Sequence, residues 1–228
     1  YRAGGVLAVL AQVRELLHPE PITVTGSPLV DYLADRPVYD DTVIMPRDAP
    51  LMANAGIAVL RGNLAPRGAL VKPAAATAEL LQHTGPAVVF DSIEDMRARI
   101  DEPDLDVTAD SVLVLRGCGP KGYPGMPEVG NMPLPRKLLE AGVRDMVRIS
   151  DARMSGTAYG TVILHVSPEA AAGGPLGLVR TGDLITVDLE NRTLSVAVPD
   201  DELAARQESA ATRAAYAADS CRAASSSS

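Results

Sequence analysis

Residues 57–72 read IAVLRGNLAPRGALVK and hold two short apolar runs on either side of a turn. The first run ends at Leu60, a Pro-Arg-Gly turn occupies 66–68, and the second run extends from Ala69 to Lys72. Glycine and proline mark turns, and an apolar run of about four residues has the length of a short buried strand. The segment therefore predicts a hairpin-like pair of strands.

Similar short apolar runs recur along the chain. Strands are predicted at 87–90, 112–115, 145–149 and 162–166, and a hairpin at 184–198. Helices are predicted at 74–82, 92–100 and 134–141, with a turn at 83–86 and Ser92 as an N-cap. Because the strands outnumber the helices and do not alternate with them, we predict a mixed α/β fold. Its centre is a closed or nearly closed β-barrel with helices packed outside, rather than a doubly wound sheet.

Three regions are expected from these patterns. Residues 1–54 form an N-terminal helix and a connecting segment with extended pieces near 22–29 and 40–45. Residues 55–206 form the barrel domain. Residues 207–228 are rich in alanine and serine and are expected to be a disordered tail.

Composition narrows the class of protein. The 228 residues carry a formal charge of -8, so a nucleic-acid partner is not expected, and no apolar run reaches the length of a membrane span. Two cysteines, Cys118 and Cys221, cannot form a disulfide framework, which favours the cytoplasm.

The loop that follows the strand at 112–115 reads RGCGPKGYPGMPE from 116 to 128. Its four glycines and three prolines fix a tightly folded backbone whose N–H groups can face an anion. The loop delivers one carboxylate, Glu128, which is either a ligand for a hard cation or a solvated surface group. Cys118 alone cannot hold an iron-sulfur cluster, so we expect it to pack as a small apolar residue.

A second loop of small residues reads SDARMSGTAYG from 150 to 160. Its small neighbours leave the Ser155 hydroxyl free to approach a substrate as a nucleophile or a base, although such strings also form hydrogen-bonded turns. No Ser-His-Asp spacing supports hydrolase chemistry. His165, in the next strand, is expected to be partly buried.

The stretch GNLAPRGALVK at 62–72 and the two loops occur in one order, and together they resemble the C-terminal half of the dihydroxyacid/6-phosphogluconate dehydratase family. The resemblance extends from Tyr1 to about Arg206. Members that act on branched-chain dihydroxy acids carry Asp-Gly-Arg-Phe-Ser-Gly where this chain has DARMSG from 151 to 156. The chain is therefore more similar to the sugar-acid (aldonate) dehydratases.

The resemblance implies a mechanism and a set of partners. In that family an iron-sulfur cluster activates the leaving hydroxyl, Mg²⁺ holds the substrate carboxylate, and a serine alkoxide removes the proton from C2. Ser155 would be the base, Glu128 a magnesium ligand and Thr157 a substrate-binding residue. The cluster cysteines and the other magnesium ligands lie in an N-terminal domain of the family, so this chain alone would be inactive.

We thus expect a hydro-lyase that converts a small sugar acid to a 2-keto-3-deoxy acid, acts with the N-terminal domain of the same protein and forms a homo-oligomer. The alternatives are a dihydroxyacid dehydratase of branched-chain amino-acid synthesis and a non-catalytic ligand-binding barrel. The tail after Arg206 departs from the family pattern, which suggests a truncated or frame-shifted end.

Overall fold

The computed structural model describes residues 1–53, 55–125, 128, 132–153 and 159–210. The chain divides into two compact units, Tyr1–Asn54 and Ala55–Ser228. Among the described residues, every helix is too short or too polar to cross a membrane.

The first unit holds α1 (Gly5–Gln12), the 3₁₀ helix η1 (Arg14–Leu16) and α2 (Leu29–Tyr32). The extended piece near 22–29 amounts to one isolated bridge between Ile22 and Pro28. The extended piece predicted at 40–45 is wrong, because the Asp40 side chain accepts hydrogen bonds from the backbone N–H and the hydroxyl of Thr42. This local contact stabilises a turn instead of a strand.

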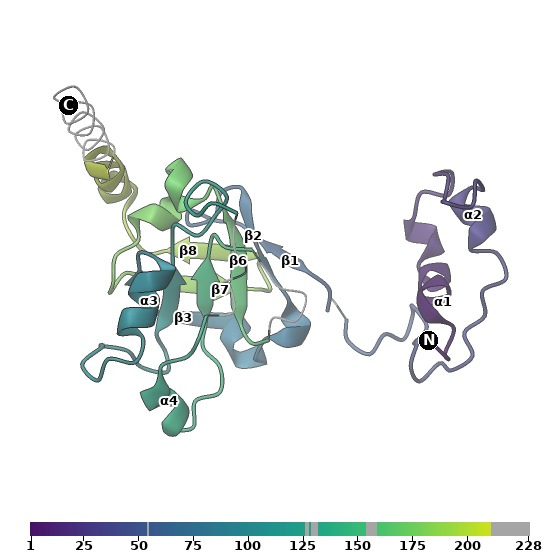
Figure 1. Ribbon diagram of the computed structural model, residues 1–228, viewed down its shortest axis with the longest axis horizontal. Helices are drawn as coiled ribbons and strands as arrows, with labels where there is room; N and C mark the ends of the chain where they lie inside the picture. Colours follow the sequence, from purple (N-terminus) through teal and green to yellow (C-terminus); the bar gives the residue numbers. More distant parts are fainter. Residues whose placement is uncertain (54, 126–127, 129–131, 154–158, 211–228) are drawn as a thin grey trace. The chain divides into compact units, whose positions relative to one another are not determined.

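The second unit is built on one sheet with the strand order β1-β2-β6-β5-β4-β3-β7-β8 (Figure 1). The pairs β3–β4, β4–β5 and β5–β6 are parallel, and the other pairs of neighbouring strands are antiparallel. Their bounds are Ala58–Leu60 (β1), Gly68–Val71 (β2), Gln82–Phe90 (β3), Val112–Leu115 (β4), Arg148–Ser150 (β5), Val162–Ser167 (β6), Leu184–Asp188 (β7) and Thr193–Val196 (β8).

The two edge strands meet at a seam, formed by residues 61–63 against residues 192–196. The Arg61 N–H donates to the Arg192 carbonyl, and the Arg61 carbonyl accepts from the Leu194 N–H, both at 2.9 Å. The Asn63 amide then exchanges two 2.9 Å hydrogen bonds with the backbone of Val196. A side chain at Gly62 would bring its Cβ within 2.1 Å of the Leu194 carbonyl oxygen. These contacts nearly close the sheet, so the predicted mixed α/β fold with a nearly closed barrel is confirmed.

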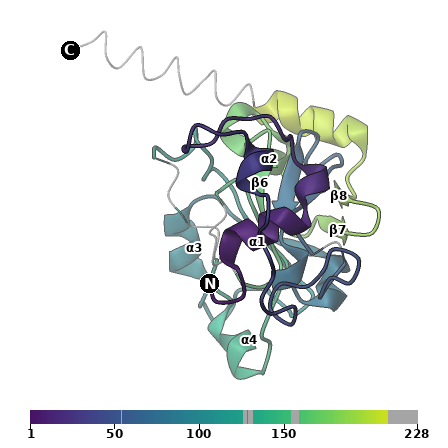
Figure 2. The ribbon, with the colours of Figure 1, turned by 90° about the vertical axis from the view of Figure 1, so that its right-hand side faces the viewer.

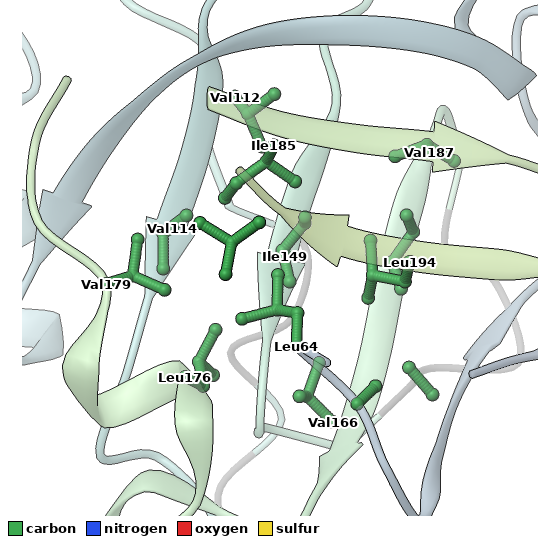
Figure 3. Packing of buried hydrophobic residues seen from close by; sticks show 14 of the residues in the cluster. Leu64, Val112, Val114, Ile149, Val166, Leu176, Val179, Ile185, Val187 and Leu194 are labelled. Atoms are coloured by element: carbon green, nitrogen blue, oxygen red, sulfur yellow. The ribbon is translucent and has the colours of Figure 1, made fainter. Parts of the chain in front are cut away.

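Apolar side chains fill the interior of the barrel (Figure 3). Along β4, Val112 and Val114 face this interior, whereas Leu113 and Leu115 belong to a second cluster on the outer face. Strands that are buried on both faces read as continuous apolar runs, which explains the sequence of β4.

Two helices cover the outer face of the parallel strands (Figures 1 and 2). The helix α3 (Ile93–Arg99) begins at Ser92, whose hydroxyl accepts from the Asp95 N–H at 3.0 Å as predicted. It buries Ile93 and Met96 against the outer cluster. The helix α4 (Arg136–Glu140) follows, and a last helix covers residues 200–210. Short 3₁₀ helices complete the unit at Pro73–Ala75 (η2), Ala78–Leu81 (η3), Ala170–Ala172 (η4) and Pro175–Leu178 (η5).

Two local predictions are wrong around residues 74–86. The predicted helix at 74–82 consists of the two short 3₁₀ helices η2 and η3. The predicted turn at 83–86 is the first half of β3, because Gln82 to Pro86 pair residue by residue with β7. Gly85 is needed there because a Cβ atom would lie 1.8 Å from the Asp110 carbonyl oxygen.

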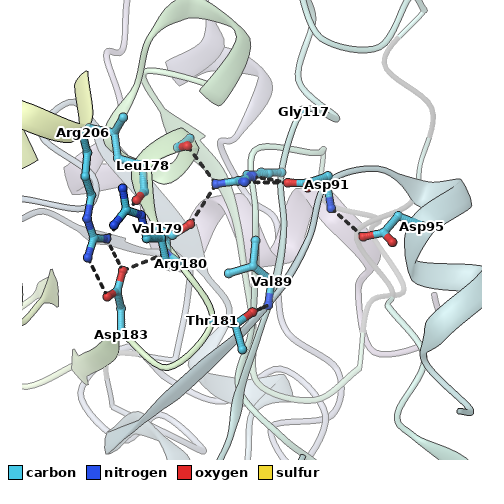
Figure 4. Close-up of polar contacts among 12 residues, drawn as sticks. Val89, Asp91, Asp95, Gly117, Leu178, Val179, Arg180, Thr181, Asp183 and Arg206 are labelled. Carbon is cyan, nitrogen blue, oxygen red and sulfur yellow. Dashed lines mark hydrogen bonds and ion pairs between the residues drawn. The ribbon is translucent and has the colours of Figure 1, made fainter. Parts of the chain in front are cut away.

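Two arginines form hydrogen bonds and ion pairs that hold the segment 177–183 in place (Figure 4). Arg116, directly after β4, donates to Asp91 and, at 2.8 Å each, to the carbonyls of Gly177 and Val179. Arg206, on the last helix, pairs with Asp183 and Glu202. Residues 207–210, placed in the tail from the sequence, continue this helix, and the rest of the tail lies outside the described residues.

Candidate active site

The carboxyl ends of three neighbouring parallel strands form one edge of the barrel, which we call the site edge. β4 ends at Leu115, β5 at Ser150 and β6 at Ser167, and Leu115 lies opposite Ser150 in the register. Residues 117–128 (the glycine loop) leave β4, and residues 151–160 (the serine loop) leave β5. Because parallel strands end on the same side of a sheet, the two loops begin next to each other.

Asp151 joins the start of the serine loop to the start of the glycine loop. The carboxylate is buried and accepts a 2.8 Å hydrogen bond from the Cys118 N–H and a 3.2 Å hydrogen bond from the Gly117 N–H. It also accepts from the Ala170 N–H, beyond β6, at 2.9 Å. One buried carboxylate therefore ties together the chain segments that follow β4, β5 and β6.

Glu169 binds the middle of the glycine loop. Its two carboxylate oxygens lie 3.0 Å from the Lys121 backbone nitrogen, and one also accepts from the Gly122 N–H at 3.4 Å. Gly119 makes this approach possible, because a Cβ atom there would lie 2.1 Å from a Glu169 oxygen. Several N–H groups of the glycine loop thus face anions as the sequence predicted, and these anions are carboxylates of the same chain.

Glu128 and Arg153 connect the far part of the glycine loop to the serine loop. The Glu128 carboxylate is exposed and lies 3.7 Å from an Nη atom of Arg153. Arg153 precedes Ser155 by two residues. Ser155 and Thr157, the predicted base and substrate-binding residue, lie outside the described residues.

A cavity of about 400 Å³ opens at the site edge beside the glycine loop. Two cationic residues, Arg67 and Lys121, line it together with Asp151, Glu169 and His165. His165 interrupts the regular strand with a φ of 55°, and its N–H donates to the Ala152 carbonyl. The side chain is half-buried, and this burial lowers the pKa of the imidazole, which therefore favours its neutral form.

The side chains near the site edge determine whether this chain could bind an iron-sulfur cluster or Mg²⁺. Cys118 is fully buried, and burial, together with the nearby Asp151 and Glu94 carboxylates, raises the pKa of its thiol to about 12. A thiol in this state does not fit an iron-sulfur ligand, which must be a thiolate. Within the described part of the chain, no three His, Cys, Asp or Glu side chains gather as a metal site. Glu128 offers one exposed carboxylate, which fits a single ligand of a shared Mg²⁺ site.

The sequence did not assign a role to Asp151, Glu169 or Arg148, although the first and third stand in the segment DMVRISD at 145–151. No local sequence pattern marks Glu169, which follows β6 and binds a loop 48 positions earlier in the chain.

Residues 42–227 match the family described as Dihydroxy-acid/6-phosphogluconate dehydratase C-terminal. The chain belongs to this family. The match reaches residue 227, beyond Arg206, where the sequence alone placed the end of the resemblance.

Several curated relatives of this dehydratase chain are named as sugar-acid dehydratases. The chain is 59% identical over 206 residues to an L-arabonate dehydratase of Azospirillum brasilense, and the aligned part covers 89% of the chain and 35% of the relative. It is 53% identical to an L-arabinonate dehydratase of Rhizobium leguminosarum bv. trifolii (strain WSM2304) and 54% identical to a 6-deoxy-6-sulfo-D-gluconate dehydratase of Pseudomonas putida. In both cases 90% of the chain and 36% of the relative are covered, so the chain spans just over a third of their length.

Proposed function

We propose that this chain is the C-terminal part of a hydro-lyase that removes water from a sugar acid and yields a 2-keto-3-deoxy acid. Membership in the dehydratase family and the names of the sugar-acid relatives support this reaction class. The observation that carries the proposal is the contact between Glu128 and Arg153, which brings together the glycine loop and the serine loop. Both loops leave adjacent parallel strands, where α/β proteins commonly build their sites.

In this proposal Ser155 removes the proton from C2 of the sugar acid, and Thr157 binds the substrate beside it. A C–H bond next to a carboxylate is weakly acidic, so the negative charge that forms must be stabilised. A serine acts as a base where positive charge lowers the pKa of its hydroxyl. The Arg153 guanidinium, two residues away in the chain, is one nearby source of positive charge.

Glu128 is the proposed magnesium ligand of this chain. A bound Mg²⁺ would hold the substrate carboxylate and stabilise the charge that develops on it, and an iron-sulfur cluster would activate the leaving hydroxyl. The described residues supply one suitable carboxylate and no suitable thiolate. We therefore assign the remaining ligands to the N-terminal domain of the longer protein.

An anionic substrate is consistent with the cavity at the site edge. Arg67 and Lys121 line it, and cationic side chains at a concave surface attract small carboxylates even where the net charge is negative. The Asp151 and Glu169 carboxylates beside them are already hydrogen-bonded to backbone N–H groups. These hydrogen bonds partly offset the negative charge of Asp151 and Glu169. The two carboxylates therefore repel a bound anion less strongly than carboxylates without hydrogen bonds would.

The experiment is kinetic and uses the full-length protein. Sugar acids, including L-arabonate and 6-deoxy-6-sulfo-D-gluconate, are screened for 2-keto-3-deoxy products. On the best substrate, Ser155→Ala should lower kcat by about a hundredfold to ten-thousandfold with little change in KM, because a base acts in the proton-transfer transition state.

Glu128→Gln serves as the contrasting variant. Weakening a magnesium ligand should raise both KM and the Mg²⁺ concentration needed for activity, and excess Mg²⁺ should partly restore the rate. Near-normal turnover of Ser155→Ala, or its rescue by Mg²⁺, would contradict the assignment of the base. Turnover of branched-chain dihydroxy acids in preference to sugar acids would contradict the substrate class.

A further inference from the structure

Arg148 contacts the end of the serine loop and Met132, which lies shortly after the glycine loop. It is the first residue of β5, and its side chain is only 7% exposed. One terminal nitrogen, Nη1, donates to the Met132 carbonyl at 2.9 Å, and the other, Nη2, donates to the Tyr159 carbonyl at 3.0 Å. Met132 follows Glu128 by four residues, and Tyr159 follows Ser155 by four residues.

Asp145 fixes this guanidinium in place. Its carboxylate is 6% exposed and lies 3.1 Å from Nη2 of Arg148. It also accepts hydrogen bonds from the Thr161 N–H at 2.8 Å and from the Thr77 hydroxyl at 2.7 Å. A buried ion pair with this many additional hydrogen bonds restrains the orientation of the arginine.

Gly160 leaves the space that the guanidinium occupies. A Cβ atom at this position would lie 2.1 Å from Nη2 of Arg148 and 2.5 Å from an Asp145 oxygen. The residue also has a φ of +89°, which favours glycine, and its N–H donates to the Ala75 carbonyl at 2.8 Å. The end of the serine loop is therefore shaped around the arginine side chain.

We propose that Arg148 is a positioning residue that sets the distance between the loop bearing Glu128 and the loop bearing Ser155. The inference rests on the proposed function of these two residues. A guanidinium has a rigid planar fork, so its two terminal nitrogens can bind two separate carbonyls at a fixed spacing. A lysine has one terminal nitrogen on a flexible stem and cannot hold both carbonyls in the same geometry. Precise spacing matters because a displacement of about 1 Å in an active site can cost about a hundredfold in rate.

The first test measures backbone hydrogen exchange in this chain by mass spectrometry. Arg148→Lys keeps a positive charge beside Asp145 but cannot bind the Met132 and Tyr159 carbonyls at the same time. We expect exchange to become at least about tenfold faster in peptides covering 119–132 and 151–160, because local opening becomes easier when buried hydrogen bonds are lost. Peptides from β3 and β7 should not change. The matched control is Arg144→Lys, since Arg144 is exposed and donates only to the carbonyls of Leu139 and Val143.

Gly160→Ala provides a second, independent variant if Arg148→Lys does not fold. The added methyl group displaces the guanidinium without removing its charge. It should accelerate exchange in 119–132 as well as in 151–160, although Gly160 belongs only to the serine loop. Faster exchange confined to 151–160, or an equal acceleration in every strand, would overturn the proposal.

Kinetics of the full-length protein separate this inference from the proposed function. Arg148→Lys should lower kcat at least about tenfold with a smaller change in KM, because the substrate still binds while the catalytic groups are displaced. If Ser155→Ala retained activity, the proposed function would fail, while the exchange measurement would still decide whether Arg148 holds the two loops. An unchanged kcat in Arg148→Lys would overturn the positioning role.

Discussion

Two buried carboxylates flank β5 and have different partners. Asp145, before the strand, binds Arg148 and two threonines. Asp151, after the strand, has backbone N–H groups of the neighbouring loops as its partners among the described residues. Glu128 differs from both because its carboxylate is exposed and has one distant cationic partner. A carboxylate whose acceptor sites are filled stabilises structure, and an accessible one remains available for a ligand.

The charge of Asp145 should make part of the stability depend on pH. Burial opposes its ionisation, but hydrogen bonds from Thr77 and Thr161 and the charge of Arg148 outweigh burial and lower its pKa below the ordinary 3.8. A lowered pKa in the folded state means that the ionised group stabilises the fold above the ordinary pKa. This contribution is lost as the pH falls through the lower, folded-state pKa.

Comparing the wild type with Asp145→Asn tests this effect. The variant should be less stable near neutral pH, and the difference in the free energy of unfolding should shrink as the pH falls below the ordinary pKa of 3.8. Urea unfolding at a series of pH values measures that difference. A gap that stays constant with pH would show that the charge of Asp145 does not contribute.

The sequence predicted the role of a residue correctly where its hydrogen-bond partner lies only a few positions away in the chain. The Ser92 cap depends on Asp95, three residues away, so the local pattern was sufficient. The role of Asp151 depends on Cys118, 33 residues away, and no local pattern contains that distance. Glu128 and Ser155 were candidates from the loop sequences, the family resemblance supplied their specific roles and that of Thr157, and these roles stay predictions.

At the level of elements, the seam depends on the short stretch that follows β1. Asn63 binds the N–H and the carbonyl of Val196 with its side-chain amide, as a neighbouring strand would do with its backbone. Gly62 allows the two chains to approach. The stretch 62–72, which carried part of the family resemblance, therefore helps to hold the barrel together at the seam.

Asn63→Ala should destabilise the barrel by about 1–3 kcal/mol, because the two Val196 backbone groups lose their partners in a partly buried setting. Urea unfolding is the measurement. Asn191→Ala in the β7–β8 turn is the control, since it removes one exposed side-chain hydrogen bond to Asp188 and leaves no backbone group of a neighbouring strand without a partner, so it should cost about 0.5 kcal/mol. An equal effect of the two substitutions would show that the seam does not depend on the Asn63 side chain.

Elements with a continuous apolar sequence were predictable, and those that depend on distant pairing were not. β4 consists of four apolar residues and was predicted with its correct bounds. β3 begins five residues before the predicted strand, because Gly85 and Pro86 favour a turn locally while pairing with β7 favours a strand. Closure of the barrel was expected from the number of short strands, but the strand order requires contacts that no local pattern contains.

At the scale of the whole molecule, the two hydrophobic clusters lie in the second unit. The described residues of the first unit bury only Ala3, Ala8 and Leu33 among their apolar side chains. The barrel thus has a core of its own, whereas its site edge offers one accessible carboxylate on the glycine loop. Under the proposed function, this scaffold supplies one metal ligand, and the remaining ligands come from the N-terminal domain of the longer protein.

The chain expressed alone should therefore be colourless and inactive. Two cysteines cannot replace a cluster site, and the Cys118 thiol is buried and protonated. After reconstitution with iron and sulfide, the absorption spectrum should lack charge-transfer bands in the visible range, and sugar acids should remain unchanged. The full-length protein treated in the same way is the control, and a brown, iron-containing fragment would contradict the prediction.

The seam also bears on how the chain is synthesised, because Asn63 and Val196 are 133 residues apart. Ribosomes add about 5–20 residues per second, so on the order of ten seconds pass between the synthesis of Asn63 and the synthesis of its partner Val196. During this interval the free edge of β1 can pair with a strand of another nascent chain. The growing polypeptide thus keeps this edge of the sheet open until its final hairpin emerges from the ribosome.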